Sequence, residues 1–216
     1  MFMAKDKIMT FDEYRIKYWR MFIILEKELV EALDYVELGI GNFSTTSIIF
    51  SKLLLSIGAE VDNVLREYSG LTERSSIEFY YNFIIGKHPA IVDQKVKIKD
   101  TIIDLKPYDG WNGNQPSQSL NFWQKYNELK HDRVLNAGNA SLETVLNALA
   151  GLFTIELYRF NDIFMTQSDT FINMPGDGLE SKLFILDKWD LKMRTSKLKM
   201  DYSLFDEETG SYDFHV

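Results

Sequence analysis

The sequence of 216 residues contains no cysteine and only three histidines. The absence of cysteine excludes disulfides, thiol catalysis and cysteine-ligated zinc or iron–sulfur sites. The histidines, His88, His131 and His215, are scattered along the chain, so we expect neither a histidine-based metal site nor a metal cofactor. Long apolar runs are also missing, because polar residues interrupt each one before the ~20 residues that a bilayer span requires. We therefore expect no membrane-spanning segment.

The start of the sequence, MFMAKDKIMTFDEY, lacks the apolar core and the small-residue cleavage site of a signal peptide. The expected location is therefore the cytoplasm. The formal net charge of −8 argues against broad electrostatic affinity for nucleic acid. Residues 182–199 nevertheless carry six cationic and two acidic side chains. This segment is either a local basic patch or a solvated strand face.

Apolar residues recur at spacings of three and four over several segments, which predicts helices. Thr10 with Glu13, and Ser75 with Glu78, have the spacing of a capping box, in which two residues at a helix start cap each other's backbone. The first helix is expected to run from Thr10 to near the Gly39–Gly41 pair. The other predicted helices cover about 44–68, 75–85, 117–133 and 141–164.

Residues 94–106 are rich in Val, Ile and Thr, alternate in part and predict one or two short strands outside the bundle. MPGDG at 174–178 predicts a hinge, and residues 179–216 are too few to bury a core of their own. The expected fold is mainly α, an antiparallel helical bundle with a small β insert and a short C-terminal β appendage. The expected domains are the bundle at 1–173, with its insert at about 90–110, and the appendage at 174–216.

The segment WQKYNELKHDR, residues 123–133, is the strongest indication of a functional site. On a helix, Trp123, Asn127 and His131 are four residues apart and form one stripe. The same segment contains Lys125, Tyr126, Lys130 and Arg133. An imidazole beside cations suits phosphate chemistry near neutral pH.

Together with the helix FSTTSIIFSKLLLSIGAEVDNVLREYSG and the apolar helix LETVLNALAGLF, this segment resembles uncharacterised bacterial members of the HEPN superfamily. The resemblance covers roughly residues 44–158 and rests on a W-x2-YN-x2-KH-x-R motif, with Glu60 and Asp62 in support. It implies a helical bundle that pairs through the motif helix, so that two copies of the motif face each other across a dimer cleft. Active members of the superfamily are metal-independent ribonucleases.

The superfamily motif is an Arg, four to six intervening residues and a His, often with Asn directly after the Arg. Aligned on His131, the Asn position is Asn127 and the Arg position is Tyr126. Lys125 keeps a positive charge one residue earlier. Arg133 offers a guanidinium, but on a continuous helix it lies about 200° around the axis from His131. It reaches His131 only if the helix ends or bends there, or from a partner subunit.

On this basis His131, Asn127 and Arg133 are the expected catalytic residues. His131 is either the general acid/base of RNA cleavage or a buried histidine bonded by Asn127 or Glu60. Asn127 holds that histidine or a phosphate oxygen, or it bonds to backbone. Arg133 binds phosphate or forms a salt bridge with a neighbouring acid.

Lys125, Lys130, Tyr126 and Glu60 are the expected substrate-binding residues. For Lys130 the alternative is a salt bridge, and for Glu60 it is a structural ion pair, because a partly buried carboxylate needs a partner. Two tryptophans, Trp111 and Trp123, stack on a base or pack in the core. His88 and His215 are interpreted as loop residues.

The sequence thus favours a HEPN-like RNA-directed protein, and specifically a metal-independent endoribonuclease of a defence or toxin-like system. The expected partners are a second copy of the chain, RNA or a nucleotide, and an antitoxin-like protein. The alternative is a catalytically inactive helical module for dimerisation or for binding a nucleotide or RNA.

Overall fold

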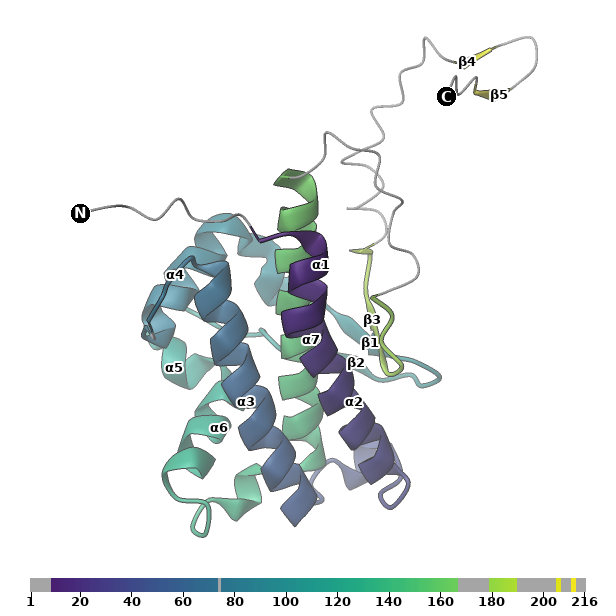
Figure 1. Ribbon diagram of the computed structural model, residues 1–216. Coiled ribbons are helices and arrows are strands. Elements are labelled where there is room, and N and C mark those ends of the chain that lie inside the picture. The colour runs from purple at the N-terminus through teal and green to yellow at the C-terminus, as the bar shows by residue number, and fades with distance from the viewer. Residues whose placement is uncertain (1–8, 74, 167–178, 190–204, 207–210, 213–216) are drawn as a thin grey trace.

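The computed structural model describes residues 9–73, 75–166, 179–189, 205–206 and 211–212 (Figure 1). Its helices are α1 (Phe11–Tyr14), α2 (Arg20–Leu33), α3 (Ile48–Tyr68), α4 (Ile77–Lys87), α5 (Pro116–Ser119), α6 (Asn121–His131) and α7 (Leu142–Thr166). Its strands are β1 (Val96–Ile98), β2 (Asp104–Leu105), β3 (Phe184–Leu186), β4 (Phe205–Asp206) and β5 (Ser211–Tyr212). The mainly helical fold with a small β insert is therefore confirmed.

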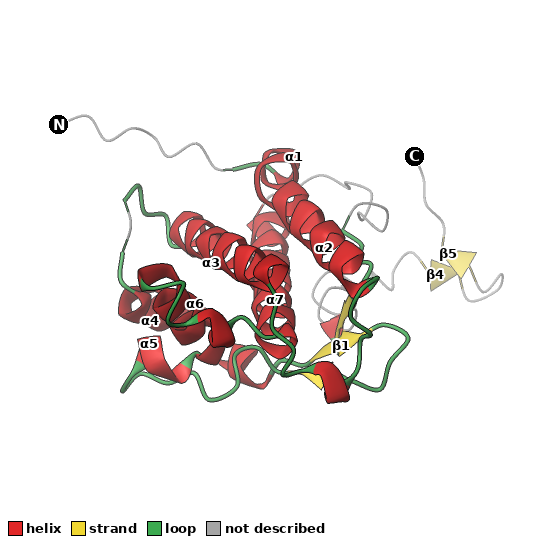
Figure 2. Ribbon diagram, turned by 90° about the horizontal axis from the view of Figure 1, so that it is seen from below, coloured by secondary structure: helices red, strands yellow, loops and turns green. Residues whose placement is uncertain are grey.

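The long helices α3 and α7 lie side by side at the centre and run in the same direction. Near their N-terminal ends, Thr46 and Ser141 form a β-bridge. Near their C-terminal ends, the guanidinium of Arg159 donates two hydrogen bonds to the carboxylate of Glu67. Helices α2 and α6 run the opposite way, so the long helices alternate in direction along the chain. Figure 2 shows α4, α5 and α6 on one side of this central pair and the sheet on the other.

The N-terminal helix begins with the predicted capping box of Thr10 and Glu13. It then contains a π-helical turn at Arg15–Trp19, which the spacing of apolar residues did not indicate. Helix α2 ends at Leu33, several residues before the predicted end, because Val36 and Leu38 pack against the core from a loop. The cap of α4 is Ser76 and not the predicted Ser75, since the hydroxyl of Ser76 accepts the N–H of Phe79.

The predicted helix over 117–133 is broken at Leu120, between α5 and α6. Leu120 has φ −90° and ψ 92°, an extended conformation, and its side chain is fully buried. The indole N–H of Trp111 donates to the carbonyl of Pro116 at the start of α5. Burial of Leu120 and this bond fix the direction in which α6 leaves the break.

Strands β2, β1 and β3 form one antiparallel sheet in that order, with Val96 opposite both Leu105 and Leu186. Strand β3 comes from the predicted C-terminal appendage and pairs with the predicted insert. The buried carboxylate of Glu26 on α2 accepts the N–H groups of Lys182 and Leu183, both at 3.0 Å, and holds this segment against the bundle. Strands β4 and β5 pair antiparallel, and the predicted hinge at 174–178 lies outside the described residues.

Among the helices that the structure describes, none is long and apolar enough to cross a membrane.

Candidate functional site

Helix α6 carries most of the predicted site residues. Its buried face consists of Phe122, Trp123, Tyr126 and Leu129. Trp123 is 7% exposed and Trp111 only 3% exposed, so both belong to the core and neither presents a ring for a base to stack on. The other faces of α6 hold the polar residues of the motif.

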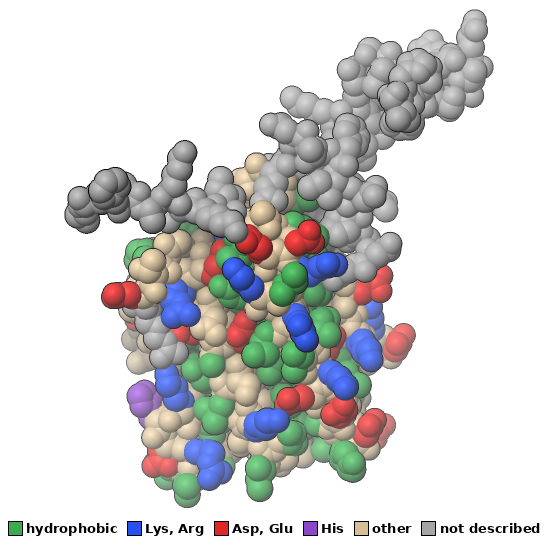
Figure 3. Space-filling model, in the orientation of Figure 1, with side chains coloured by type: hydrophobic (Ala, Val, Ile, Leu, Met, Phe, Trp, Pro, Cys, Tyr) green, Lys and Arg blue, Asp and Glu red, His purple; other side chains and the backbone are tan. Residues whose placement is uncertain are grey.

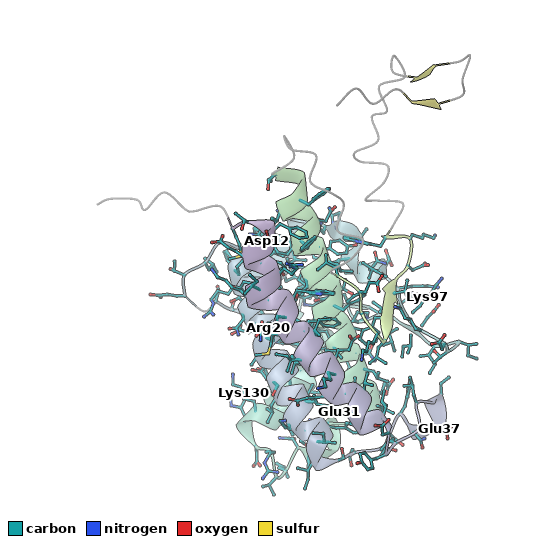
Figure 4. All side chains as sticks on the ribbon, turned by 45° about the vertical axis from the view of Figure 1, so that its right-hand side comes forward. Asp12, Arg20, Glu31, Glu37, Lys97 and Lys130 are labelled. Atoms are coloured by element: carbon teal, nitrogen blue, oxygen red, sulfur yellow. The ribbon has the colours of Figure 1, made fainter. Side chains whose placement is uncertain are left out.

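Tyr126, which the sequence resemblance aligned with the Arg of the HEPN motif, lies in the interior and is 2% exposed. Its ring packs against Gly58 of α3, where a Cβ atom would come within 2.3 Å of the ring carbons Cγ and Cδ2. The ammonium of Lys130 lies 5.5 Å from the centroid of the same ring. Tyr126 therefore joins α6 to α3, and its ring supports the exposed Lys130, which lies at the edge of the molecule in Figure 4.

Asn127 and Lys125 do not approach His131. The side-chain amide of Asn127 donates to the backbone carbonyl of Trp123 at 3.0 Å. Asn127 therefore bonds to backbone, one of the two roles that the sequence left open for it. The ammonium of Lys125 donates to the hydroxyl of Thr144 on α7 at 3.3 Å. Lys125 lies six positions before His131, so the two side chains leave α6 on different faces, about 120° apart.

His131 is the last residue of α6, and its side chain is exposed. Asp132 follows with φ −145° and ψ 94°, so the helix stops here. Arg133 therefore does not lie on the opposite face of the helix from His131, as it would if the helix continued. Arg133 is exposed as well. Within the described part of the chain, no hydrogen bond or ion pair engages either side chain. The end of α6 thus presents an imidazole and a guanidinium two residues apart to solvent.

The loop after α6 is held by its own polar side chains. The carboxylate of Asp132 accepts the N–H groups of Val134 at 3.1 Å and Leu135 at 3.0 Å. The amide of Asn136 donates to the carbonyls of Glu128 and Asp132. Val134 and Leu135 are each left 81% exposed. Figure 3 shows apolar side chains along this lower edge of the molecule.

Glu60 lies apart from the end of α6. Gly58 faces α6, and Glu60, two residues on, lies about 200° around α3. Its carboxylate accepts the amide of Asn63 at 3.1 Å, and among the described residues nothing joins it to His131 or Arg133. Burial raises the pKa of Glu60, although the Asn63 hydrogen bond lowers it in part. Glu60 therefore belongs to the bundle interior.

A second cluster of polar side chains joins α3, α4 and α7, and sequence reasoning missed it. The hydroxyl of Tyr68 donates to Oδ2 of Asp162 and lies 2.5 Å from Nε2 of His88. Nε2 of His88 is 3.2 Å from the same carboxylate oxygen, and the ammonium of Lys87 is 2.6 Å from it. The structure thus corrects the interpretation of His88 as a plain loop residue. Tyr68, His88 and Asp162 are too far apart in sequence for any spacing to indicate the cluster.

The chemistry of this cluster is that of a partly buried ionic junction. Three donors share one carboxylate oxygen of Asp162, and burial together with Asp162 raises the pKa of Tyr68, so the phenol stays protonated. The ring of His88 packs edge-on against Tyr158, with the centroids 4.9 Å apart. These groups all bond to one another, so the cluster holds the ends of α3 and α4 against α7. The end of α6, with its exposed His131 and Arg133, is therefore the candidate site.

In the described ranges, no group of three or more His, Asp or Glu side chains is placed to hold a metal ion. His215 lies outside these ranges. Comparison of the chain with protein-family models, curated proteins and solved structures gives no match.

Proposed function

We propose that this chain is a HEPN-like RNA-directed protein of the cytoplasm, which acts as a metal-independent endoribonuclease in a homodimer. His131 serves as general acid or base, while Arg133 and Lys130 bind the phosphate that is cleaved. A defence or toxin-like setting, with an antitoxin-like protein that masks the same surface, is part of this proposal.

The observation that supports it is the end of α6 at His131. Because Asp132 leaves the helix, Arg133 can turn towards the imidazole, which a continuous helix would prevent. A guanidinium binds phosphate oxygens through two parallel hydrogen bonds, and an imidazole transfers protons near neutral pH. The two functional groups that phosphodiester cleavage needs most are thus exposed at one point of the molecule.

The cleavage requires two proton transfers. A base removes the proton of the ribose 2′-hydroxyl as its oxygen attacks phosphorus, and an acid protonates the departing 5′-oxygen. The new 2′-oxygen–phosphorus bond replaces the 5′-oxygen–phosphorus bond, so the products are a 2′,3′-cyclic phosphate and a 5′-hydroxyl. Among its described residues, one chain offers a single histidine at this surface, and a two-fold axis beside Val134 and Leu135 would add the second.

The alternative is a catalytically inactive module for dimerisation or for binding RNA or a nucleotide. It is favoured by the position of Tyr126, which fills the superfamily's Arg position with a buried ring. Lys125 does not replace that Arg, because its ammonium bonds to Thr144 away from His131.

RNA cleavage by the purified protein in EDTA tests the proposal. Wild type is expected to cut and to leave 2′,3′-cyclic phosphate ends, because the proposed groups are all side chains of the protein. His131→Ala is expected to lose ~10²–10⁴-fold in rate. Arg133→Ala is expected to lose ~10-fold or more through weaker stabilisation of the phosphate charge.

Arg20→Ala is the matched control, because Arg20 is exposed on α2, a helix that carries none of the proposed site residues. All variants should keep the wild-type melting temperature, since the substituted side chains are exposed. Undiminished cleavage by His131→Ala would reject this site. A wild type without activity on diverse RNAs would select the inactive module.

A further inference from the structure

A cavity of about 480 Å³ lies between the sheet edge and the N-terminal ends of α6 and α7, away from His131. Strand β2 supplies Asp104 and Leu105, and Lys106 and Asp109 follow it. The helices supply Phe122, Lys125, Glu143, Thr144 and Asn147. Its size falls in the range of small-molecule sites, which is ~300–1,000 Å³. Most of its exposed lining is polar, so its ligand should be polar too.

The cavity lining carries three lysines and three acids, and one of the lysines is paired with an acid. Lys95 lies 3.9 Å from Asp104 and forms an ion pair with it. Lys106 and Lys125 have no ion pair within the described part of the chain. Lys125 is half-buried, and its ammonium is held by the hydroxyl of Thr144. The half-buried ammonium of Lys125 favours an anionic group in the cavity, since a partly buried charge needs a partner. The exposed Lys106 adds a second positive charge to the lining.

The start of α6 adds to this preference for an anion. Asn121, its first residue, and Phe122 both line the cavity. The helix has no side-chain cap and no acidic residue in its first turn, so its positive end is not compensated. The start of α7 differs, because the N–H of Glu143 donates to the carbonyl of Phe43. The anion is therefore expected on the α6 side.

The remaining polar groups of the cavity suit hydroxyl groups. The exposed carboxylates of Asp109 and Glu143 accept hydrogen bonds, and the half-buried amide of Asn147 already donates to the carbonyl of Glu143 and keeps its oxygen as an acceptor. A ligand with an anion at one end and several hydroxyl groups at the other satisfies both sets of groups.

We propose that this cavity binds a small phosphate monoester rich in hydroxyl groups, of the sugar-phosphate class. The phosphate contacts Lys106, Lys125 and the first turn of α6, and the sugar hydroxyls donate to Asp109, Glu143 and Asn147. This inference does not rest on RNA cleavage, and its test involves no RNA.

Isothermal titration calorimetry with ribose 5-phosphate tests the proposal, with ribose, inorganic phosphate and adenosine 5′-monophosphate as comparison ligands. Ribose 5-phosphate is expected to bind the full chain with a dissociation constant of about 1 mM or tighter. Ribose should not bind measurably, and inorganic phosphate should bind more weakly. If adenosine 5′-monophosphate binds as tightly as ribose 5-phosphate or more tightly, the site is supported and its ligand is identified as a mononucleotide.

Lys125→Met keeps the bulk of the side chain and removes its charge, and Lys106→Gln does the same at an exposed position. Each is expected to weaken ribose 5-phosphate binding ~10-fold, the effect of losing one charge-assisted hydrogen bond. Lys27→Gln, on the exposed face of α2, is the matched control and should bind like wild type. The proposal is overturned if no phosphate ester binds at ~10 mM, if ribose binds as tightly as its phosphate, or if both lysine variants bind like wild type.

Discussion

The ring of Tyr126 lies against Gly58 so closely that no side chain fits between α3 and α6 at this point. A Cβ atom on residue 58 would come within 2.3 Å of two ring carbons. Tyr126 therefore works as a packing contact, and the glycine opposite is a steric requirement of the fold.

Gly58→Ala should consequently destabilise the protein. Alanine in place of glycine normally stabilises a helix by ~1 kcal/mol. Here the clash with a buried ring should outweigh that gain, and we expect a net loss of ~1–3 kcal/mol in urea unfolding. Gly86→Ala on α4 is the control, because no atom lies within 4 Å of its Cβ position, and it should be neutral or stabilising. In a Tyr126→Ala background the cost of Gly58→Ala should shrink, and an unchanged cost would contradict the contact.

The exposed apolar residues beside His131 predict how the chain assembles. Under the proposed function, Val134 and Leu135 lie in a two-fold interface, so wild type should be a dimer by light scattering coupled to gel filtration. Leu135→Glu should shift it towards monomer, because a two-fold axis places the new charges close together. Ile102→Glu, at a side chain 97% exposed in the turn between β1 and β2, is the control and should stay dimeric. A monomeric wild type at high concentration would reject the interface.

The junction at Asp162 predicts acid sensitivity. Burial alone would raise the pKa of Asp162, but hydrogen bonds from His88, Lys87 and Tyr68 outweigh burial and lower the pKa to about 2. A carboxyl with a depressed pKa in the folded state stabilises the fold above its unfolded pKa, and this contribution disappears as pH falls through the folded value. Between pH ~4 and ~2 the free energy of unfolding of wild type should therefore fall by about 2 kcal/mol more than that of Asp162→Asn. Urea unfolding over this range measures the difference, and parallel curves for the two proteins would contradict it.

Glu156 on α7 predicts the opposite trend at higher pH. Its side chain is fully buried, and neither carboxylate oxygen has a hydrogen-bond partner among the described residues. Burial, with a contribution from the charge of Glu60, raises the pKa of Glu156 well above its ordinary value. The folded state then keeps a proton that the unfolded state loses, so stability falls as pH rises above the unfolded pKa.

Glu156→Gln should be more stable than wild type at pH ~8, because a neutral amide replaces the carboxylic acid and no longer titrates. The advantage should grow between pH ~5 and ~8, by up to ~1.4 kcal/mol per pH unit. Urea unfolding of both proteins at several pH values checks this. A difference that does not change with pH would show that the pKa of Glu156 is not raised in the folded state.

Local patterns in the sequence were enough to place the main helices. The capping box of Thr10 and Glu13 and the apolar spacing through α3 and α7 depend on neighbours within a few residues, so they can be read without the fold. The same holds for the strands near 94–106. The apolar stripe also extended past Leu33, and there it was misleading, because Val36 packs against the core from a loop.

The geometry of the candidate site needed tertiary contacts. The sequence placed Asn127, His131 and Arg133 on one segment, but only the fold shows that α6 stops at His131 and that Asn127 turns to the backbone. Glu60, expected near His131, lies on another face of α3, because Tyr126 occupies the face around Gly58.

What the sequence by itself determined is therefore the class of fold, the existence of α6 and the chemical character of its end, since periodicity and capping are local properties of the chain. Only the tertiary structure decided which polar groups meet. The junction of Tyr68, His88 and Asp162, and the pairing of β1 with β3, join segments that are distant in the chain. Such contacts form because burying the apolar faces of α3 and α7 fixes the helices side by side, and no short-range pattern records which side chains then lie opposite one another.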